Sequence, residues 1–457
     1  MQTTLAHPPL HARLRMSSFG KSAIAALLVF IAVLLVQWPL ARNPGYFSHD
    51  ELQWAVFAAD GAGFDFGAWR TFQYRPLTFG LWSWLSRALF EQPAMFHTVL
   101  VAIGAFNAAL LMLLGRRMGL STRAAVIGAV LFALGPFAMY VHGWVGTIAD
   151  LLWVGCALLL GVTVAGKPAT GTIVVASVLL TTIALLAKEA AVSIPALLAI
   201  AWWCFGRARH WGLAAMASSA PVILYLLARV SVLLSAGPQG SAYDWSLGHI
   251  PLRWLEYQLF VPNITLFETA NALKGGFGSK RLLLASILWL AAFVVLYRVG
   301  WRWALAWLVG GIAALGPVLV LGAATNHYGY AFAALGAMLL AAAWPRTDRI
   351  GRGVIVVLAV LNLWHGINVM REMRRVGEVQ AVFSPAVVRT LDASATAATP
   401  LQLELAPDAS AWVFARLLHN VPSYQRIPLG GRVQLVPQEA QAEYRIEADG
   451  TLTRLAR

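Results

Sequence analysis

Eleven apolar runs constrain this chain more than any other feature of its sequence. A hydrocarbon core about 30 Å thick needs about 20 consecutive apolar residues in a spanning helix. The number of runs that reach or approach this length predicts an all-α polytopic membrane protein with about 11 transmembrane helices. The runs lie approximately at 22–40, 94–114, 123–141, 148–166, 171–187, 190–206, 211–235, 281–298, 302–322, 328–344 and 351–370.

The composition excludes the alternatives to a membrane protein. Of the 457 residues, 59% are hydrophobic and 12% are charged. So few charges cannot cover the surface of soluble domains of this size, and a disordered chain needs low hydrophobicity. The net charge of +14 would suggest nucleic acid in a soluble protein, but in a membrane protein it first reports orientation. We therefore expect a membrane and no nucleic acid as partner.

The distribution of lysine and arginine predicts which ends of the spans face the cytoplasm. If residues 1–21 are cytoplasmic, the short connections on that side carry fourteen of the 34 basic residues, and the much longer opposite connections carry nine. Basic residues in short loops favour the cytoplasm. We therefore predict a cytoplasmic N-terminus and, after eleven spans, an outer C-terminus. The fourteen are Arg13, Arg15, Lys21, Arg116, Arg117, Arg123, Lys167, Arg207, Arg209, Arg298, Arg302, Arg346, Arg349 and Arg352.

The acidic residues gather on the predicted outer side. Ten acids precede residue 346, and in this topology each lies on the outer face or at its edge. Acids contribute little to topology, so the rules of membrane insertion do not explain this segregation. An outward-facing reaction or binding site would explain it. The ten are Asp50, Glu51, Asp60, Asp65, Glu91, Asp150, Glu189, Asp244, Glu256 and Glu268.

The character of the chain changes after residue 370. The charge content rises, and Pro385 and Pro400 punctuate the sequence. Residues 401–406 and 432–436 alternate as short strands do. This end is therefore predicted to be a small α+β domain outside the membrane. The predicted divisions are a cytoplasmic segment at 1–21, a transmembrane domain at 22–370 with outer loops at 41–93 and 236–280, and the C-terminal domain at 371–457.

The first outer loop carries an adjacent acidic pair. Asp50 and Glu51 follow His49 about ten residues beyond the first apolar run. In a functional pair, one acid would be a general base, and its neighbour would adjust the pKa of that base or bind a cation. His49 would then add a nitrogen ligand, so that the three residues hold a divalent metal cation. The alternative is a solvated pair of loop acids.

Two outer cations are candidate ligands for phosphate. Arg75 precedes Pro76, which disfavours helix at Arg75 and suits the first helical position. A guanidinium near a helix N-terminus attracts phosphate through bidentate hydrogen bonds and through free N–H groups. Lys188 lies in a tight connection between two spans, where its charge would neutralise a phosphate. The alternatives are a lipid headgroup bound to Arg75 and an ion pair between Lys188 and Glu189.

Other polar residues stand at the outer ends of predicted spans. Asp150 begins the run at 148–166, and an acid within an apolar run is costly and usually functional. Its alternative role is to complement the helix dipole. His327 and Tyr328 lie between two late runs and have groups that hydrogen-bond phosphates or sugars. We predict Tyr330 to be an interfacial belt residue.

Taken in order, these motifs resemble the GT-C superfamily of integral-membrane glycosyltransferases, over about residues 20–345. The Arg-Pro-Leu and Lys-Glu elements are most similar to protein O-mannosyltransferases with tetratricopeptide repeats and to bacterial enzymes that modify lipopolysaccharide. This chain has no such repeats, and Asn326-His327-Tyr328 stands where that branch has a Glu-Arg-Tyr-like element. The features that carry the resemblance are His49-Asp50-Glu51, Tyr74-Arg75-Pro76-Leu77, Asp150, and Lys188-Glu189 before Pro195.

The resemblance implies an activity and a place in the cell. Such an enzyme takes a sugar from a polyprenyl-phosphate-linked donor on the outer face of a membrane, here expected to be the bacterial inner membrane. It passes the sugar to an acceptor hydroxyl of a cell-surface glycan, lipid or protein, usually with inversion. A hexosyl- or pentosyltransferase is therefore expected. The alternative is a transporter or flippase for a lipid-linked or anionic solute, although charges at one face fit surface chemistry better than a pathway through the bilayer.

The resemblance also implies roles for the residues. Asp50 would be the base that removes the acceptor proton. Glu51 would orient the acceptor or help to hold a divalent cation, and Asp150 would bind the acceptor or the metal. The departing phosphate, whose charge grows in the transition state, would be stabilised by cations. The residues implied to contact it are Arg75, Lys188, His327 and Tyr328, supported by Glu189.

Overall fold

The computed structural model describes residues 18–204, 206–235, 243–264, 267–269, 272–273, 276, 278–393, 400–437 and 442–455. Most of the predicted segment at 1–21 and parts of the predicted loop at 236–280 lie outside these ranges. In the lists that follow, η marks a 3₁₀ helix. The helices are α1 (Ser18–Val36), α2 (Trp38–Ala41), α3 (His49–Ala59), α4 (Pro76–Leu89), α5 (Pro93–Arg117), α6 (Thr122–Ala133), α7 (Pro136–Gly143), η1 (Val145–Thr147), α8 (Ile148–Ala165), α9 (Thr170–Ala187), η2 (Glu189–Ser193), α10 (Ile194–Cys204), α11 (Arg209–Leu233), η3 (Leu247–His249), α12 (Ile250–Phe260), α13 (Lys280–Val299), α14 (Trp301–Leu315), η5 (Gly316–Val320), η6 (Asn326–Gly329), α15 (Tyr330–Ala343), η7 (Trp344–Arg346), α16 (Arg349–Ala393) and α17 (Ala411–Leu418). The strands are β1 (Leu401–Leu405), β2 (Ser423–Tyr424), β3 (Ile427–Pro428), β4 (Val433–Val436), β5 (Tyr444–Ile446) and β6 (Leu452–Arg454).

The predicted polytopic membrane protein is confirmed. Within the described residues, eight helical segments are long and apolar enough to span a membrane. A ninth span is formed if α6 and α7, bent by 59° relative to each other, are counted together. The bend falls at Gly135-Pro136, where proline lacks an N–H and disfavours helix in the residue before it. Two shorter apolar segments, Gly20–Val36 and Glu189–Cys204, coincide with the two remaining apolar runs.

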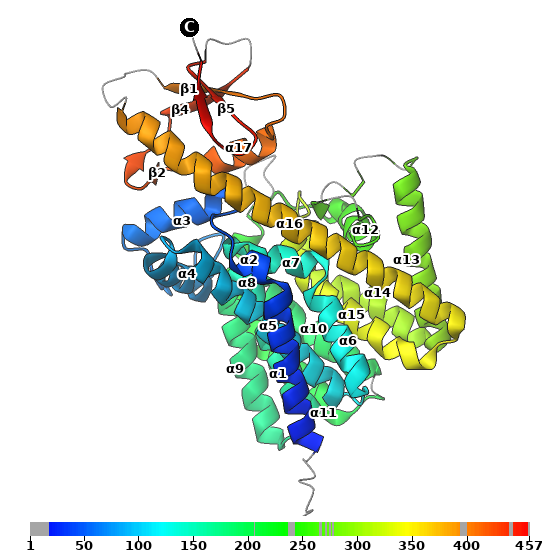
Figure 1. The fold of residues 1–457 in the computed structure, drawn as a ribbon. Coiled ribbons are helices and arrows are strands. Elements are labelled where there is room, and N and C mark those ends of the chain that lie inside the picture. Colours follow the sequence, from blue (N-terminus) through cyan, green and yellow to red (C-terminus); the bar gives the residue numbers. More distant parts are fainter. Residues whose placement is uncertain are drawn as a thin grey trace, which may run out of the picture.

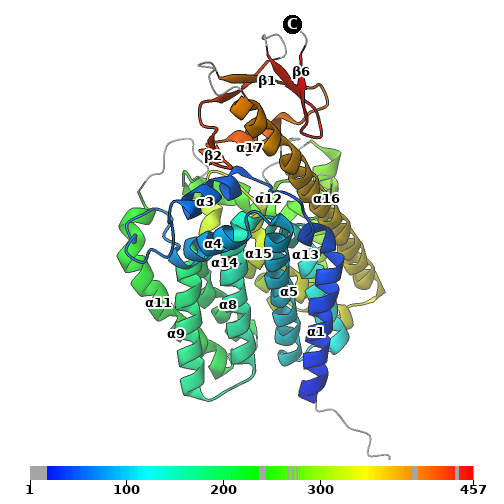
Figure 2. The same cartoon turned by 60° about the vertical axis from the view of Figure 1, so that its left-hand side comes forward.

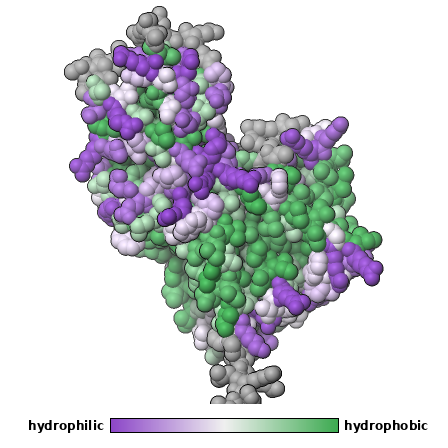
Figure 3. Space-filling model, in the orientation of Figure 1, coloured by the Kyte–Doolittle hydropathy of each residue, from purple (hydrophilic) through white to green (hydrophobic). Residues whose placement is uncertain are grey.

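The spanning helices form a bundle whose outer surface is apolar. Figure 2 shows α1, α5, α8, α9 and α11 running together along the bundle. Leucines on this surface, including Leu28, Leu227 and Leu283, are more than half exposed. The face in Figure 3 has a broad hydrophobic area over the helices, with polar residues over the C-terminal domain and at the opposite end. So large an apolar surface is compatible with lipid and not with water.

The predicted outer loop at 41–93 is largely helical. Its helices α3 and α4 contact each other and lie at the end of the bundle nearest the C-terminal domain (Figures 1 and 2). The acids at the starts of α8 and η2, Asp150 and Glu189, stand at this same end of their helices. The bundle therefore presents α3, α4 and the helix ends beneath the C-terminal domain.

Helix α16 joins the two parts of the molecule. It contains 45 residues, which corresponds to about 68 Å at about 1.5 Å per residue, so it leaves the membrane and continues into the C-terminal domain (Figure 1). The predicted division after residue 370 falls inside it. Its polar half is still helical because ion pairs at helical spacing support it, Arg374 with Glu378 at 2.7 Å and Arg375 with Glu372 at 2.6 Å. Pro385 lies within the helix and does not end it.

The C-terminal domain has the strands that the alternation predicted. β1 pairs in parallel with β4 and β5, and β5 pairs antiparallel with β6, in the order β4-β1-β5-β6. Helix α17 buries one face, including Val413, Phe414 and Leu417. The ring of Phe414 lies 4.9 Å from that of Phe383 in α16. The domain is therefore packed directly on the extension of α16.

Candidate active site

The segment that carries the predicted base is held against α16. The Asn43 side chain donates a hydrogen bond to the Met373 carbonyl at 3.2 Å, and the Tyr46 N–H donates to Gln380 Oε1 at 2.8 Å. Between them, Gly45 lies so close that an added Cβ would stand 2.2 Å from the Gly377 carbonyl oxygen. These contacts fix the path of the chain into α3.

Helix α3 begins with a capping box. Ser48 is its N-cap, with the side chain accepting a hydrogen bond from the Asp50 N–H, and the Ser48 N–H donates to Glu51 Oε2 at 2.6 Å. Serine followed three residues later by glutamate is a known sequence signature of this arrangement. The signature was present in the sequence at Ser48-His49-Asp50-Glu51, and it explains why the two adjacent acids have different surroundings.

Glu51 is a structural residue in this geometry. It is 1% exposed, and its second oxygen accepts the Val145 N–H at 3.1 Å, so both oxygens are bound to backbone. Burial raises the pKa of Glu51 to about 8, although these N–H donors favour the charged form. The expected contact of Glu51 with an acceptor or a cation does not fit this arrangement, because the side chain joins α3 to η1 instead.

Asp50 is the accessible acid of the pair. Its side chain is 35% exposed. One oxygen lies 3.3 Å from His49 Nε2, and the other accepts a hydrogen bond from the Ser48 hydroxyl at 3.3 Å. Burial lowers the pKa of His49, against the attraction of Asp50. A neutral imidazole and a hydroxyl therefore orient a carboxylate that a substrate is able to reach.

Arg75 is positioned as the sequence predicts, but it is already paired. Helix α4 begins at Pro76 with Arg75 as its N-cap. The guanidinium binds Glu189 with two nitrogens, with Nε 2.8 Å from Oε2 and Nη2 on Oε1. Burial would lower the pKa of Arg75, but the Glu189 carboxylate outweighs burial and raises it. The predicted support of Arg75 by Glu189 is thus a direct, partly buried ion pair.

Lys188 pairs with Asp150 and not with its neighbour Glu189. Its ammonium donates to both Asp150 oxygens, at 2.6 and 2.7 Å, and both residues are buried. The extended backbone at Lys188, with φ −159° and ψ 136°, places successive side chains on opposite sides. Asp150 thus meets a lysine, where an acceptor or a metal was expected.

Tyr328 links this pair to an apolar cavity. The Lys188 ammonium lies 4.7 Å from the centroid of the Tyr328 ring, and Tyr328 and Glu189 both line a cavity of about 310 Å³. The rest of the lining is mainly apolar or aromatic. It comes from the first outer loop, η2, α11 and η5 with the residues after them, and the segment before η3: Phe72, Ala190, Val192, Leu226, Leu234, Tyr243, Trp245, Pro317, Val318, Val320 and Leu321. The cavity therefore has a charged inner edge and an apolar body.

The neighbours of Tyr328, His327 and Tyr330, pack against other aromatic and polar side chains. The His327 ring is tilted against Tyr328 and meets Trp144 edge to face, with ring centroids 4.1 and 5.4 Å away. Tyr330 is fully buried, and its hydroxyl lies 2.9 Å from His142 Nε2. The predicted belt position of Tyr330 is wrong, because this polar contact lies inside the bundle.

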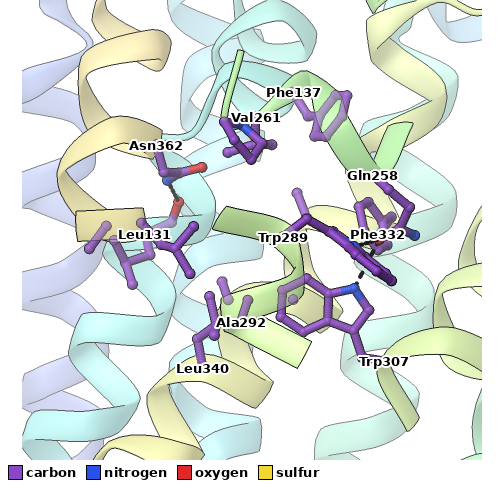
Figure 4. Close-up of a pocket in the computed structure, with 16 residues that line it drawn as sticks. Leu131, Phe137, Gln258, Val261, Trp289, Ala292, Trp307, Phe332, Leu340 and Asn362 are labelled. Carbon is purple, nitrogen blue, oxygen red and sulfur yellow. Dashed lines mark hydrogen bonds between the residues drawn. The ribbon is translucent and has the colours of Figure 1, made fainter. Parts of the chain in front are cut away.

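A second cavity, of about 90 Å³, lies between the later helices of the bundle (Figure 4). Its polar groups are engaged within the wall: Gln258 Oε1 accepts hydrogen bonds from the indole nitrogens of Trp289 and Trp307 at 2.8 and 2.9 Å. The Asn362 amide donates to the Leu131 carbonyl at 2.8 Å. No titratable side chain is among its lining residues, so this cavity offers packing and no acid–base chemistry.

The three predicted metal ligands do not fit a common cation. Glu51 already binds two backbone N–H groups, and the other two residues, His49 and Asp50, contact each other at 3.3 Å. Over the described part of the chain, no group of three or more His, Cys, Asp or Glu side chains is arranged to hold a metal ion.

The sequence analysis did not predict that two further arginines, Arg229 and Arg416, lie at this end of the molecule. Arg229 is buried in α11, where its guanidinium donates to the carbonyls of Trp69 and Phe72 and so holds the first outer loop. Arg416 of α17 lies over the rings of Phe47 and Trp144. Arg229 was noticeable as a charge within an apolar run, but nothing in the sequence connects Arg416 with the first loop.

The charged side chains of the candidate site lie close enough together to act on the same two residues, His327 and Tyr243. His327 lies within the electrostatic reach of Lys188, Arg75 and Arg416, and Tyr243 within that of Arg75, Asp50 and Glu189. Residues from the first loop, α8, η2, η6 and α17 thus form one polar region beside the apolar cavity.

A solved structure has a similar fold. The crystal structure of ArnT from Cupriavidus metallidurans bound to undecaprenyl phosphate is similar over 91% of this chain and 86% of that chain, with a TM-score of 0.51 and 15% identity. The chain has the GT-C fold. The cryo-EM structure of the arabinofuranosyltransferase AftD from Mycobacteria gives a weaker likeness to this chain, with a TM-score of 0.45 and 15% identity over 92% of this chain and 31% of that one. No protein-family model and no curated protein sequence matches.

Proposed function

We propose that this GT-C chain transfers a sugar from a polyprenyl-phosphate donor to an acceptor hydroxyl, with inversion, on the outer face of a bacterial inner membrane. The observation that carries the proposal is the accessible, oriented Asp50. It lies in the same polar region as two ion pairs, Arg75 with Glu189 and Lys188 with Asp150, and beside an apolar cavity. A base, a phosphate site and a place for a lipid are the three parts that this reaction needs.

Asp50 acts as the general base. Its carboxylate takes the proton of the acceptor hydroxyl while that oxygen attacks the anomeric carbon. The bond from the anomeric carbon to the phosphate oxygen breaks, and its electron pair leaves with the polyprenyl phosphate. His49 and Ser48 hold the carboxylate in place for this step.

Arg75 and Lys188 stabilise the departing phosphate with the N–H groups that their partners leave free. A guanidinium has five N–H donors, of which Glu189 takes two; an ammonium has three, of which Asp150 takes two. The carboxylates hold the cations in fixed positions, so they need little reorganisation when negative charge grows on the phosphate. Asp150 and Glu189 are then positioning residues.

The cavity of about 310 Å³ suits the lipid part of the donor. Its inner edge carries Glu189 and Tyr328 next to Arg75 and Lys188, whereas its body is apolar, as a polyprenyl chain requires. The structure of ArnT, which has the same fold, contains undecaprenyl phosphate. This likeness supports a polyprenyl phosphate as the lipid partner.

The proposal is tested by replacing Asp50 in cells. Mass spectrometry of lipids and surface glycans from cells with and without the gene identifies the sugar that is lost. We expect the wild-type gene and the Asp60→Asn variant, which changes an acid at the other end of α3, to restore that sugar, and Asp50→Asn to fail although the protein accumulates in the membrane. Restoration by Asp50→Asn would remove Asp50 as the base, and carrier lipid confined to the inner leaflet would indicate a flippase instead.

A further inference from the structure

Helix α17 brings Arg416 from the C-terminal domain to the polar region. The guanidinium carbon lies 4.5, 5.2 and 5.4 Å from the ring centroids of Phe47, Trp144 and Trp412. These rings come from the first outer loop, the start of η1 and α17. Among the described residues, the Arg416 side chain makes no hydrogen bond or ion pair, and its Nε is buried without a partner.

The other buried cations at this end have partners. Arg75 and Lys188 each face a carboxylate, and Arg229 donates to two carbonyls. Aromatic faces hold a guanidinium plane by cation–π attraction while its edge keeps its N–H donors. Arg416 acts electrostatically on Glu51, but no carboxylate among the described residues forms an ion pair with it, so its N–H donors are left for a ligand.

The contacts around Arg416 place it beside the candidate base. Arg416 acts electrostatically on His49, and the His49 ring lies 4.8 Å from that of His419. Gln53 donates to the carbonyls of His419 and Asn420 at 3.1 and 2.9 Å. The end of α17 is thus fastened to α3, the helix that begins at His49, so the position of Arg416 relative to Asp50 is fixed by packing on both sides.

We propose that Arg416 binds a phosphate group of a substrate next to Asp50, so that the C-terminal domain completes the site. The word substrate here rests on the proposed glycosyl transfer. The planar fork of an arginine matches phosphate oxygens in a bidentate manner. Two sources have this chemistry, the departing polyprenyl phosphate and a phosphate on the acceptor.

Binding measurements on the purified full-length chain test this without turnover. The chain is placed in nanodiscs of phosphatidylcholine and titrated separately with inorganic phosphate and with undecaprenyl phosphate, and the midpoint of thermal unfolding is followed. We expect Arg416→Gln to weaken binding of at least one probe by about tenfold or more, the scale of a lost charged hydrogen bond. Arg454→Gln, which removes an exposed arginine of β6, should bind both probes as the wild type does.

The two probes distinguish the sources. Weaker binding of undecaprenyl phosphate by Arg416→Gln assigns Arg416 to the donor phosphate, whereas loss confined to inorganic phosphate assigns it to the acceptor. Unchanged affinity for both, or no phosphate binding by the wild type, overturns the proposal. If Arg416→Gln does not fold, the same two titrations are made with Arg416→Lys. This variant keeps the positive charge but loses the bidentate guanidinium, so weaker binding of a probe is again expected. These outcomes do not depend on whether Asp50→Asn abolishes transfer.

Discussion

At the scale of single residues, Glu51 shows burial and hydrogen bonding acting against each other. Burial raises its pKa from 4.5 to about 8, more than the two N–H donors lower it. In the unfolded chain this glutamate loses its proton near its ordinary pKa. Between these two values, the folded state binds the extra proton, so raising the pH costs stability.

We therefore expect the contribution of Glu51 to the unfolding midpoint to fall as the pH rises from about 5 to about 8, opposite in sign to that of His49, whose pKa is lowered by burial. One group contributes at most about 1.4 kcal/mol per pH unit. Glu51→Gln should flatten this part of the profile, because glutamine does not titrate, although it loses one acceptor. Thermal unfolding in detergent at several pH values measures the effect, and identical slopes for both proteins would show that Glu51 is charged throughout.

We expect substitutions of Arg75 and Glu189 to have non-additive effects on protein stability. Arg75→Ala should raise the donor KM more than the acceptor KM, because it removes phosphate contacts and leaves Glu189 as an unpaired, partly buried acid. Arg75→Ala with Glu189→Gln should recover protein stability but not donor affinity. Donor titrations and unfolding of the two single variants and the double variant measure both. A wild-type donor KM in Arg75→Ala would exclude the phosphate role.

At the scale of elements, the entry to α3 depends on how closely Gly45 approaches α16. A Cβ there would meet the Gly377 carbonyl at 2.2 Å and Gln380 Oε1 at 2.6 Å. The contact with the Gly377 carbonyl is not able to relax without moving the first loop or the helix, and a shift of the Gln380 side chain would break its hydrogen bond with the Tyr46 N–H. The loop that presents Asp50 and the helix that carries the C-terminal domain are therefore coupled at this point.

Gly45→Ala is expected to cost about 1–3 kcal/mol of stability, as overpacking does, and to lower transfer by displacing Asp50. Gly63→Ala is a matched control in the same loop, since its Cβ would meet nothing closer than 4.0 Å. Unfolding midpoints and transfer rates of both variants give the comparison. Equal behaviour would mean that the first loop is free to shift without loss of the site.

At the scale of the whole molecule, charge separates the two ends of the bundle. Five connections and the helix ends beside them hold eleven of the fourteen basic residues assigned to the cytoplasm: those between α5 and α6, α8 and α9, α10 and α11, α13 and α14, and α15 and α16. The opposite end holds α3, α4 and the C-terminal domain (Figure 1). The separation is part of the structure, and the cytoplasmic assignment of the basic end is a prediction.

Labelling in intact cells tests this orientation. With Cys156 and Cys204 changed to alanine, we expect a cysteine at Arg454 to react with a membrane-impermeant maleimide, since the C-terminal domain is predicted to face outwards. A cysteine at Arg207 should react only after the cells are opened. The reverse pattern would place the site in the cytoplasm. The basic connections would then lie outside, against the positive-inside rule.

The sequence by itself determined the membrane spans, the two longer strands and the start of α4 at Pro76, because apolar run length, alternation and proline geometry are local properties. It also identified Asp50, Arg75, Asp150 and Lys188 as the charged residues to consider. Only the tertiary structure decided their partners, pairing Lys188 with Asp150 and Arg75 with Glu189, burying Glu51 and bringing Arg416 to the first loop. Such pairings join residues far apart in the chain, and they depend on which helix ends meet after folding.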